Sequence, residues 1–110
     1  AVADLAQCPN VVAKVGGIQM VVNGFGWHDR DRPPTSDELL DANGEWYRHT
    51  IEQFGPSRCM FESNFPVDRL SCSYTVLWNQ FKKLTKGFSA DERAAMFHDT
   101  ALRVYRLPRL

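Results

Sequence analysis

Two short apolar runs, the first of them largely β-branched, interrupt an otherwise mixed pattern of hydrophobic and polar positions. Residues 11–15 read VVAKV and are closed by two glycines, and residues 58–63 read RCMFES and are closed by an Asn-Phe-Pro turn. Short apolar runs bounded by chain breakers are typical of strands buried on both faces of a parallel sheet. The pattern therefore predicts two such strands, over residues 11–15 and 58–63.

The segments around the first strand show helical spacing. Residues 2–6 have the apolar spacing of a last helical turn, and a capping box of Thr35 with Glu38 opens a helix over about residues 36–54. One face of that helix carries its large apolar side chains, Leu39, Tyr47, Ile51 and Phe54.

The C-terminal part of the chain repeats the helical pattern. Residues 74–84 carry an apolar stripe typical of a core helix, a second capping box of Ser89 with Glu92 opens a short helix through residue 97, and a last helical piece lies near residues 100–105. The order strand, helix, strand, helix, helix implies parallel pairing through a right-handed crossover. Two strands alone do not form a stable sheet, so further strands must complete it.

Composition narrows the class of protein. A chain of 110 residues allows a single domain, and its 13 basic and 13 acidic residues cancel, without the basic block of a nucleic-acid or membrane-surface binder. No apolar stretch is long enough to cross a bilayer, and the first ten residues lack the pattern of a secretion signal. Three widely spaced cysteines favour a reducing compartment, so the sequence predicts a cytoplasmic protein.

Three motifs stand in order along the chain: residues 9–17, PNVVAKVGG; residues 58–68, RCMFESNFPVD, preceded by Phe-Gly-Pro; and residues 101–107, ALRVYRL. They resemble, in that order, the penultimate strand, the last-strand signature and the closing helix of the amidohydrolase-related family. That family consists of metal-dependent TIM-barrel hydrolases and includes lactonase and decarboxylase branches.

The resemblance implies an α/β fold in which residues 1–110 form a single partial domain. That domain would be the last two βα units of a (β/α)8 barrel, with two parallel strands and three helices. A complete barrel needs about 250 residues, so the chain would be the C-terminal portion of a longer enzyme.

The resemblance also places candidate catalytic residues where the second strand ends, because TIM-barrel sites lie at the C-terminal ends of strands. Asn64 stands where the family normally has an aspartate that binds metal or activates water. An amide oxygen is a weaker metal ligand than a carboxylate, and an amide does not accept a proton from water as a carboxylate does. Asparagine at this position therefore weakens both the metal-binding role and the water-activating role. The family's other ligands, histidines on earlier strands, would precede Ala1. A divalent metal, zinc or similar, is thus implied for the intact enzyme and none is expected in this chain.

Glu62 is a second departure, because the family usually has glycine at this position. Side chains two apart on a strand share a face, which puts Glu62 roughly 6.5 Å deeper in the barrel than Asn64. Glu62 is then either a displaced catalytic carboxylate or the partner of Lys14 in a buried ion pair, since buried charges are seldom left unpaired. The two interpretations are compatible. Asp68, after the strand-end turn, is interpreted as a helix cap or a rim carboxylate.

The long loop over residues 18–35 is rich in glycine and aromatic residues. One interpretation lays it over the barrel mouth, where His28 or Arg30 contacts an anionic substrate and Trp27 excludes water. The other is a loop pinned by aromatic packing, with His28 in solvent.

The function implied by the resemblance is attack of an activated water on the carbonyl carbon of a small-molecule lactone, ester or amide. Two alternatives stay open: a non-catalytic relative that binds a ligand, and a small α/β module completed by self-association. A lone parallel pair of strands leaves two unpaired edges, so we expect a homo-oligomer with an apolar interface above about 1,000 Å² rather than a folded monomer. The isolated segment is expected to be inactive.

Overall fold

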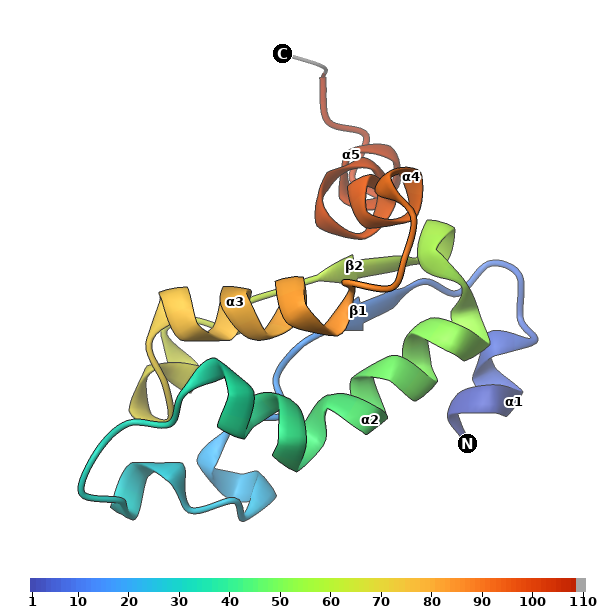
Figure 1. Cartoon of the computed structure of the whole chain (residues 1–110). Helices are drawn as coiled ribbons and strands as arrows, with labels where there is room; N and C mark the ends of the chain where they lie inside the picture. The colour runs from blue at the N-terminus through green and yellow to red at the C-terminus, as the bar shows by residue number, and fades with distance from the viewer. Residues whose placement is uncertain (109–110) are drawn as a thin grey trace.

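The computed structural model describes residues 1–108 and contains two strands among several helices (Figure 1). The regular elements are α1 (Val2–Ala6), β1 (Ala13–Val15), α2 (Ser36–Phe54), β2 (Cys59–Phe61), α3 (Tyr74–Leu84), α4 (Ala90–Ala94) and α5 (Thr100–Val104). Four 3-10 turns lie between them, at Val21–Asn23, Trp27–Asp29, Pro56–Arg58 and Val67–Leu70.

The two strands pair in parallel, as the sequence predicted, and α2 connects them. Lys14 is in register with Met60, and Val15 with Phe61. Each strand has three residues, which is fewer than predicted. The reason at the N-terminal side is that the guanidinium of Arg58, rather than a neighbouring strand, binds the backbone carbonyl of Val11 at 3.2 Å.

The core lies between the sheet and the helices α2 and α3, of which α2 runs below the strands in Figure 1. The apolar stripe predicted for α2 is confirmed, since Leu39, Tyr47, Ile51 and Phe54 are all buried. The side chain of Cys59 also belongs to this core. On α3 the stripe begins one turn later than predicted, because Tyr74 is 54% exposed at the helix start and burial begins at Leu77.

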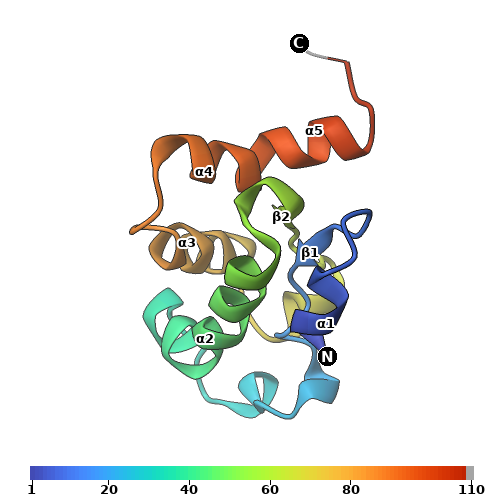
Figure 2. The ribbon, with the colours of Figure 1, turned by 90° about the vertical axis from the view of Figure 1, so that its right-hand side faces the viewer.

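The C-terminal helical pieces form one continuous run rather than the two separate pieces predicted. A π-helical turn at Ala95–Asp99 joins α4 to α5, and Figure 2 shows the two helices in succession along one side of the molecule. The capping box of Ser89 and Glu92 that opens the run is confirmed. Met96 is buried within the run and anchors it on the core.

Gly16 allows the end of β1 to lie against Glu62, and we expect Gly16→Ala to disrupt this contact. A Cβ built on Gly16 would lie 2.5 Å from the backbone oxygen of Glu62. One of the two backbone segments would have to move to make room for it. Overpacking of this kind lowers the free energy of unfolding by about 2 kcal/mol, measurable by urea denaturation. Gly87→Ala is the matched control, because nothing lies within 4 Å of its added Cβ. Equal stability of the two variants would contradict the close packing of the strand ends.

Candidate functional site

Lys14 and Glu62 form an ion pair on the face of the sheet opposite the helices. Their Nζ and Oε2 atoms are 3.3 Å apart, which confirms the predicted pairing. The pair is not buried as predicted, since the Lys14 side chain is 53% exposed and that of Glu62 is 30% exposed. Within residues 1–108 no further strand covers this face of the sheet, which explains the difference. The hydrogen bond and negative charge of Glu62 raise the pKa of Lys14 above its usual value.

Asn64 lies in the turn after β2 with its side-chain amide held in place. Its backbone is left-handed, with φ 55°, a conformation that asparagine adopts more readily than most residues. The Nδ2 group donates a 2.8 Å hydrogen bond to Oδ1 of Asp68 and lies against Gly17 at the end of β1. One N–H of the amide is thereby engaged, which leaves the carbonyl oxygen and the second N–H of Asn64 to bind a substrate or water.

Asp68 is completely buried rather than at the rim, which corrects the interpretation from sequence. It belongs to the 3-10 turn Val67–Leu70, and within the described residues its Oδ2 atom has no hydrogen-bond partner. Burial raises the pKa of Asp68, the hydrogen bond from Asn64 opposes this shift, and the charge of Glu62 adds to it. The sequence carried no signal of this burial, because Asp68 follows a turn and is flanked by polar and exposed positions.

We expect Asp68→Asn to be more stable than the original protein near neutral pH. Because the folded state raises the pKa of Asp68, stability is lost as the pH rises above the unfolded value of about 3.9, where the buried group ionises. The asparagine keeps an acceptor for Asn64 but carries no charge. The variant should therefore gain about 1 kcal/mol in the free energy of unfolding at pH 7, and this gain should shrink as the pH is lowered. Denaturant titrations at several pH values measure it, with Asp41→Asn on the exposed side of α2 as the control. A loss of stability at pH 7 would show that the fold needs the ionised carboxylate.

The three substrate-binding residues predicted from sequence lie together around one pocket of about 360 Å³. The pocket has two walls, which we call the loop wall and the turn wall. The loop wall is formed by Trp27, His28, Arg30 and Pro33, and the turn wall by residues 69–73.

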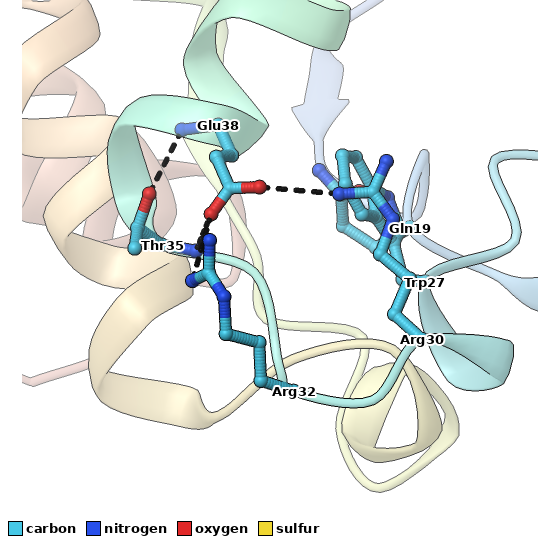
Figure 3. Close-up of polar contacts among 6 residues, drawn as sticks. All are labelled: Gln19, Trp27, Arg30, Arg32, Thr35 and Glu38. Carbon is cyan, nitrogen blue, oxygen red and sulfur yellow. Dashed lines mark hydrogen bonds and ion pairs between the residues drawn. The ribbon is translucent and has the colours of Figure 1, made fainter.

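The aromatic and charged side chains of the loop wall contact one another and their neighbours. Trp27 is only 5% exposed, and the ring of Phe25 stacks beside it with centroids 6.0 Å apart. The Arg30 guanidinium lies 4.2 Å from the Trp27 ring centroid and donates a 3.1 Å hydrogen bond to Glu38 (Figure 3). The loop is therefore held by aromatic packing and also lines a pocket, although the sequence analysis presented these two interpretations as alternatives.

The turn wall adds groups that the sequence analysis did not assign to the site. Arg69 supplies a second guanidinium besides that of Arg30, and Ser71 and Ser73 supply hydroxyl groups. Burial raises the pKa of the Cys72 thiol to about 11, so this sulfur is protonated near neutral pH and is no nucleophile. Burial does the same for Cys59, whose thiol pKa is also about 11.

The candidate catalytic residues and the pocket form two adjoining groups. Glu62 and Asn64 do not line the pocket, but Asn64 contacts Asp68, whose chain neighbour Arg69 begins the turn wall. The strand ends and the pocket are thus joined through one short 3-10 turn. A ligand in the pocket has polar groups on both walls and the strand ends beyond them.

The side chains of this chain do not fit a zinc site by themselves. Among residues 1–108 no three His, Cys, Asp or Glu side chains lie close enough to hold a metal ion. Glu62 is paired with Lys14, and Asn64 offers an amide oxygen where zinc prefers imidazole, thiolate or carboxylate ligands.

Among residues 1–108 no helix is long and apolar enough to cross a membrane.

Comparison with known proteins places this arrangement in a family. The amidohydrolase family model matches residues 1–107, so the chain belongs to the amidohydrolase family. It is 43% identical over 107 residues to the uncharacterized protein y4mH of Sinorhizobium fredii, covering 97% of this chain and 32% of that protein. It is 33% identical over 112 residues to the L-fucono-1,5-lactonase of Burkholderia multivorans, covering 98% of this chain and 34% of the lactonase. The chain therefore spans about a third of the length of these relatives.

Solved structures agree with the fold. A crystal structure of an amidohydrolase from Burkholderia multivorans with bound zinc superimposes with a TM-score of 0.80 at 32% identity, and one with bound HEPES with a TM-score of 0.76 at 30% identity. Each match covers 96% of this chain and 35% of the crystallised chain. The two parallel strands and their helices are thus a fragment of the amidohydrolase TIM-barrel fold.

Proposed function

We propose that the chain is the C-terminal part of a lactone hydrolase in which Glu62 activates the attacking water. The observation that carries the proposal is a carboxylate at the C-terminal end of a barrel strand, beside Asn64 and a pocket with polar walls. The identity to an L-fucono-1,5-lactonase supports a lactone over an ester or an amide as substrate.

In the proposed reaction Glu62 acts first as a base and then as an acid. Its free carboxylate oxygen takes a proton from water, whose oxygen forms a bond to the lactone carbonyl carbon. The ring C–O bond then breaks, and the leaving oxygen takes the proton back from Glu62, which gives a hydroxy acid. Lys14 holds the other oxygen, Oε2, and so orients the carboxylate. The carbonyl oxygen of Asn64 accepts a hydrogen bond from the attacking water and positions it.

Trp27, His28 and Arg30 are proposed to bind the part of the substrate that does not react. The guanidinium and imidazole donate hydrogen bonds to hydroxyl or carboxylate oxygens, and the buried Trp27 keeps that wall dry. A sugar lactone, which has several hydroxyl groups on a compact ring, suits a pocket of about 360 Å³ that has arginine, histidine and serine side chains among its lining residues.

We propose that a divalent metal of the intact enzyme, zinc or a similar ion, is bound by residues outside this chain. The zinc-bound amidohydrolase of Burkholderia multivorans supports metal use in the family. The lack of a fitting donor set among residues 1–108 is the reason to assign the ligands elsewhere. A cytoplasmic location is part of the proposal, and the three free cysteines agree with a reducing compartment.

A second candidate function is a non-catalytic relative that binds the same ligand. The observation that favours it is the amide of Asn64, committed through Nδ2 to Asp68, where the family has a catalytic aspartate.

The experiment that separates the two functions is a lactone hydrolysis assay on the protein encoded by the reading frame extended upstream of Ala1. L-Fucono-1,5-lactone, a simple ester and an anilide are supplied in turn, and acid release is followed with a pH indicator. We expect hydrolysis of the lactone well above the spontaneous rate and little reaction of the anilide. Saturable lactone binding without hydrolysis would favour the binding protein instead.

Expressed alone, residues 1–110 are expected to self-associate. Both edges of the two-stranded sheet lack a neighbouring strand among the described residues, and exposed edges recruit other strands. Large apolar side chains are also exposed, Val22 at 84% and Leu70 at 71%. Light scattering should give a mass of at least twice 12.6 kDa. A stable species at 12.6 kDa would contradict this and favour an independent small module.

A further inference from the structure

Three buried amide side chains form a hydrogen-bonded cluster behind the loop wall of the pocket. Gln19 comes from the loop after β1, Asn43 from α2 and Gln80 from α3, and each is 0% exposed. Nε2 of Gln19 donates to Asn43 at 3.1 Å and to Gln80 at 3.3 Å. Gln80 donates in turn to Asn43 at 2.8 Å, and Asn43 donates to Oε1 of Gln19 at 3.1 Å. We call these three residues the amide cluster.

Gln19 is the member of the amide cluster that contacts both walls of the pocket. The indole Nε1 of Trp27, in the loop wall, donates a 2.9 Å hydrogen bond to Oε1 of Gln19. The hydroxyl of Ser71, in the turn wall, donates a hydrogen bond to the backbone oxygen of Gln19. Asn43 and Gln80 have no hydrogen bond to either wall within the described residues.

We propose that Gln19 is a positioning residue that fixes the orientation of Trp27 and the separation of the two pocket walls. Its significance for substrate binding rests on the proposed function, whereas its effect on Trp27 does not. Asn43 and Gln80 hold the Gln19 amide, because its Oε1 atom accepts from both Trp27 and Asn43 while its Nε2 atom donates to two oxygens. The orientation is carried further to Arg30, which stacks on the Trp27 ring.

Loss of the Gln19 amide leaves the Trp27 indole N–H buried without a partner. A buried donor without a partner is unfavourable, so the ring rotates or the loop opens until the N–H reaches water. Either change moves Arg30 and the surface on which the substrate rests. Replacing Gln80 removes two of the four hydrogen bonds within the amide cluster, against three for Gln19, but it keeps the Trp27 hydrogen bond.

The test compares Gln19→Met with Gln80→Met in the full-length protein. Methionine has nearly the length of glutamine and forms no comparable hydrogen bonds, so each variant removes two or more bonds of the amide cluster. Two readouts are taken: the ¹H–¹⁵N resonance of the Trp27 indole, assigned with Trp27→Phe, and the KM and kcat for L-fucono-1,5-lactone. Ser71→Ala, a smaller change that removes the bond from the turn wall, is included as a third variant.

We expect Gln19→Met to shift the Trp27 indole resonance and raise KM about tenfold, with kcat within about threefold of the original value. Gln80→Met should leave the resonance in place and change KM less than twofold, and Ser71→Ala should raise KM severalfold. Equal effects of Gln19→Met and Gln80→Met on the indole would overturn the proposal and reduce the cluster to a stability role. If Gln19→Met does not fold, an unchanged KM in Ser71→Ala overturns it.

Arg30→Ala distinguishes failure of this proposal from failure of the proposed function. If Arg30→Ala leaves KM unchanged, the pocket does not bind the lactone and the proposed function fails there. The indole resonance then still decides whether Gln19 positions Trp27.

Discussion

Glu62→Gln is expected to lower kcat for lactone hydrolysis by about 100-fold or more, since a positioned general base contributes 10²–10⁴-fold. The glutamine has the same shape and keeps its place beside Gly16, but it cannot accept a proton from water. Because the Lys14–Glu62 pair is partly exposed, its loss changes the free energy of unfolding by less than about 1 kcal/mol. The measurement is steady-state kinetics on the full-length protein, together with its unfolding curve.

Two controls make this result specific to Glu62. Glu52→Gln, on the exposed side of α2, makes the same chemical change away from the strand ends and should keep kcat within twofold. Lys14→Met breaks the ion pair but leaves the carboxylate, so it should lower kcat far less than Glu62→Gln does. Full activity in Glu62→Gln would remove Glu62 from the reaction and leave it a structural partner of Lys14.

Arg58→Met is expected to lower the free energy of unfolding by about 3 kcal/mol. The guanidinium donates to the backbone oxygens of Ala6 at 2.7 Å, Cys8 at 3.1 Å and Val11 at 3.2 Å. Its Nε group also donates to Phe54 at 3.1 Å, at the end of α2. Arg58 therefore ties the segment before β1 to the start of β2, and without it these carbonyls lose their partners. Thermal and urea unfolding measure the loss.

The fork of the guanidinium, rather than its charge, is the basis of this effect. Arg58→Lys keeps the charge but has one compact ammonium group that cannot reach the same carbonyls together, so it should recover less than half of the loss. Arg48→Met, on the exposed side of α2, should change stability by less than about 0.5 kcal/mol. Equal stability of Arg58→Met and Arg48→Met would show that the N-terminal segment is held by its apolar contacts alone.

Local patterns in the sequence were sufficient for α2 and for the strand pairing. The capping box at Thr35 and Glu38 and the stripe that ends at Phe54 gave the bounds of α2, because caps and helical periodicity are properties of neighbouring residues. The ion pair of Lys14 and Glu62 was predictable for a related reason. Once the strands are parallel, two lone charges in adjacent apolar runs fall on the same face.

Features that depend on distant segments could not be predicted. Gln19 is 24 residues from Asn43 and 61 from Gln80, and no local pattern indicates that their amides meet in the core. Asp68 was misplaced at the rim for the same reason, since its burial depends on how the turn after β2 packs. The sequence predicted the loop wall of the pocket from its residue types, but the turn wall at residues 69–73 has no such signature.

The most direct test of the account is a crystal structure of the full-length protein with the product L-fuconate bound. The account predicts the sugar acid between the loop wall and the turn wall, with its hydroxyl groups within hydrogen-bond distance of His28 and Arg30. The carboxyl carbon that derives from the lactone carbonyl should point toward Asn64 and Glu62. L-Fuconate bound without contact to either wall, and away from the ends of β1 and β2, would contradict it.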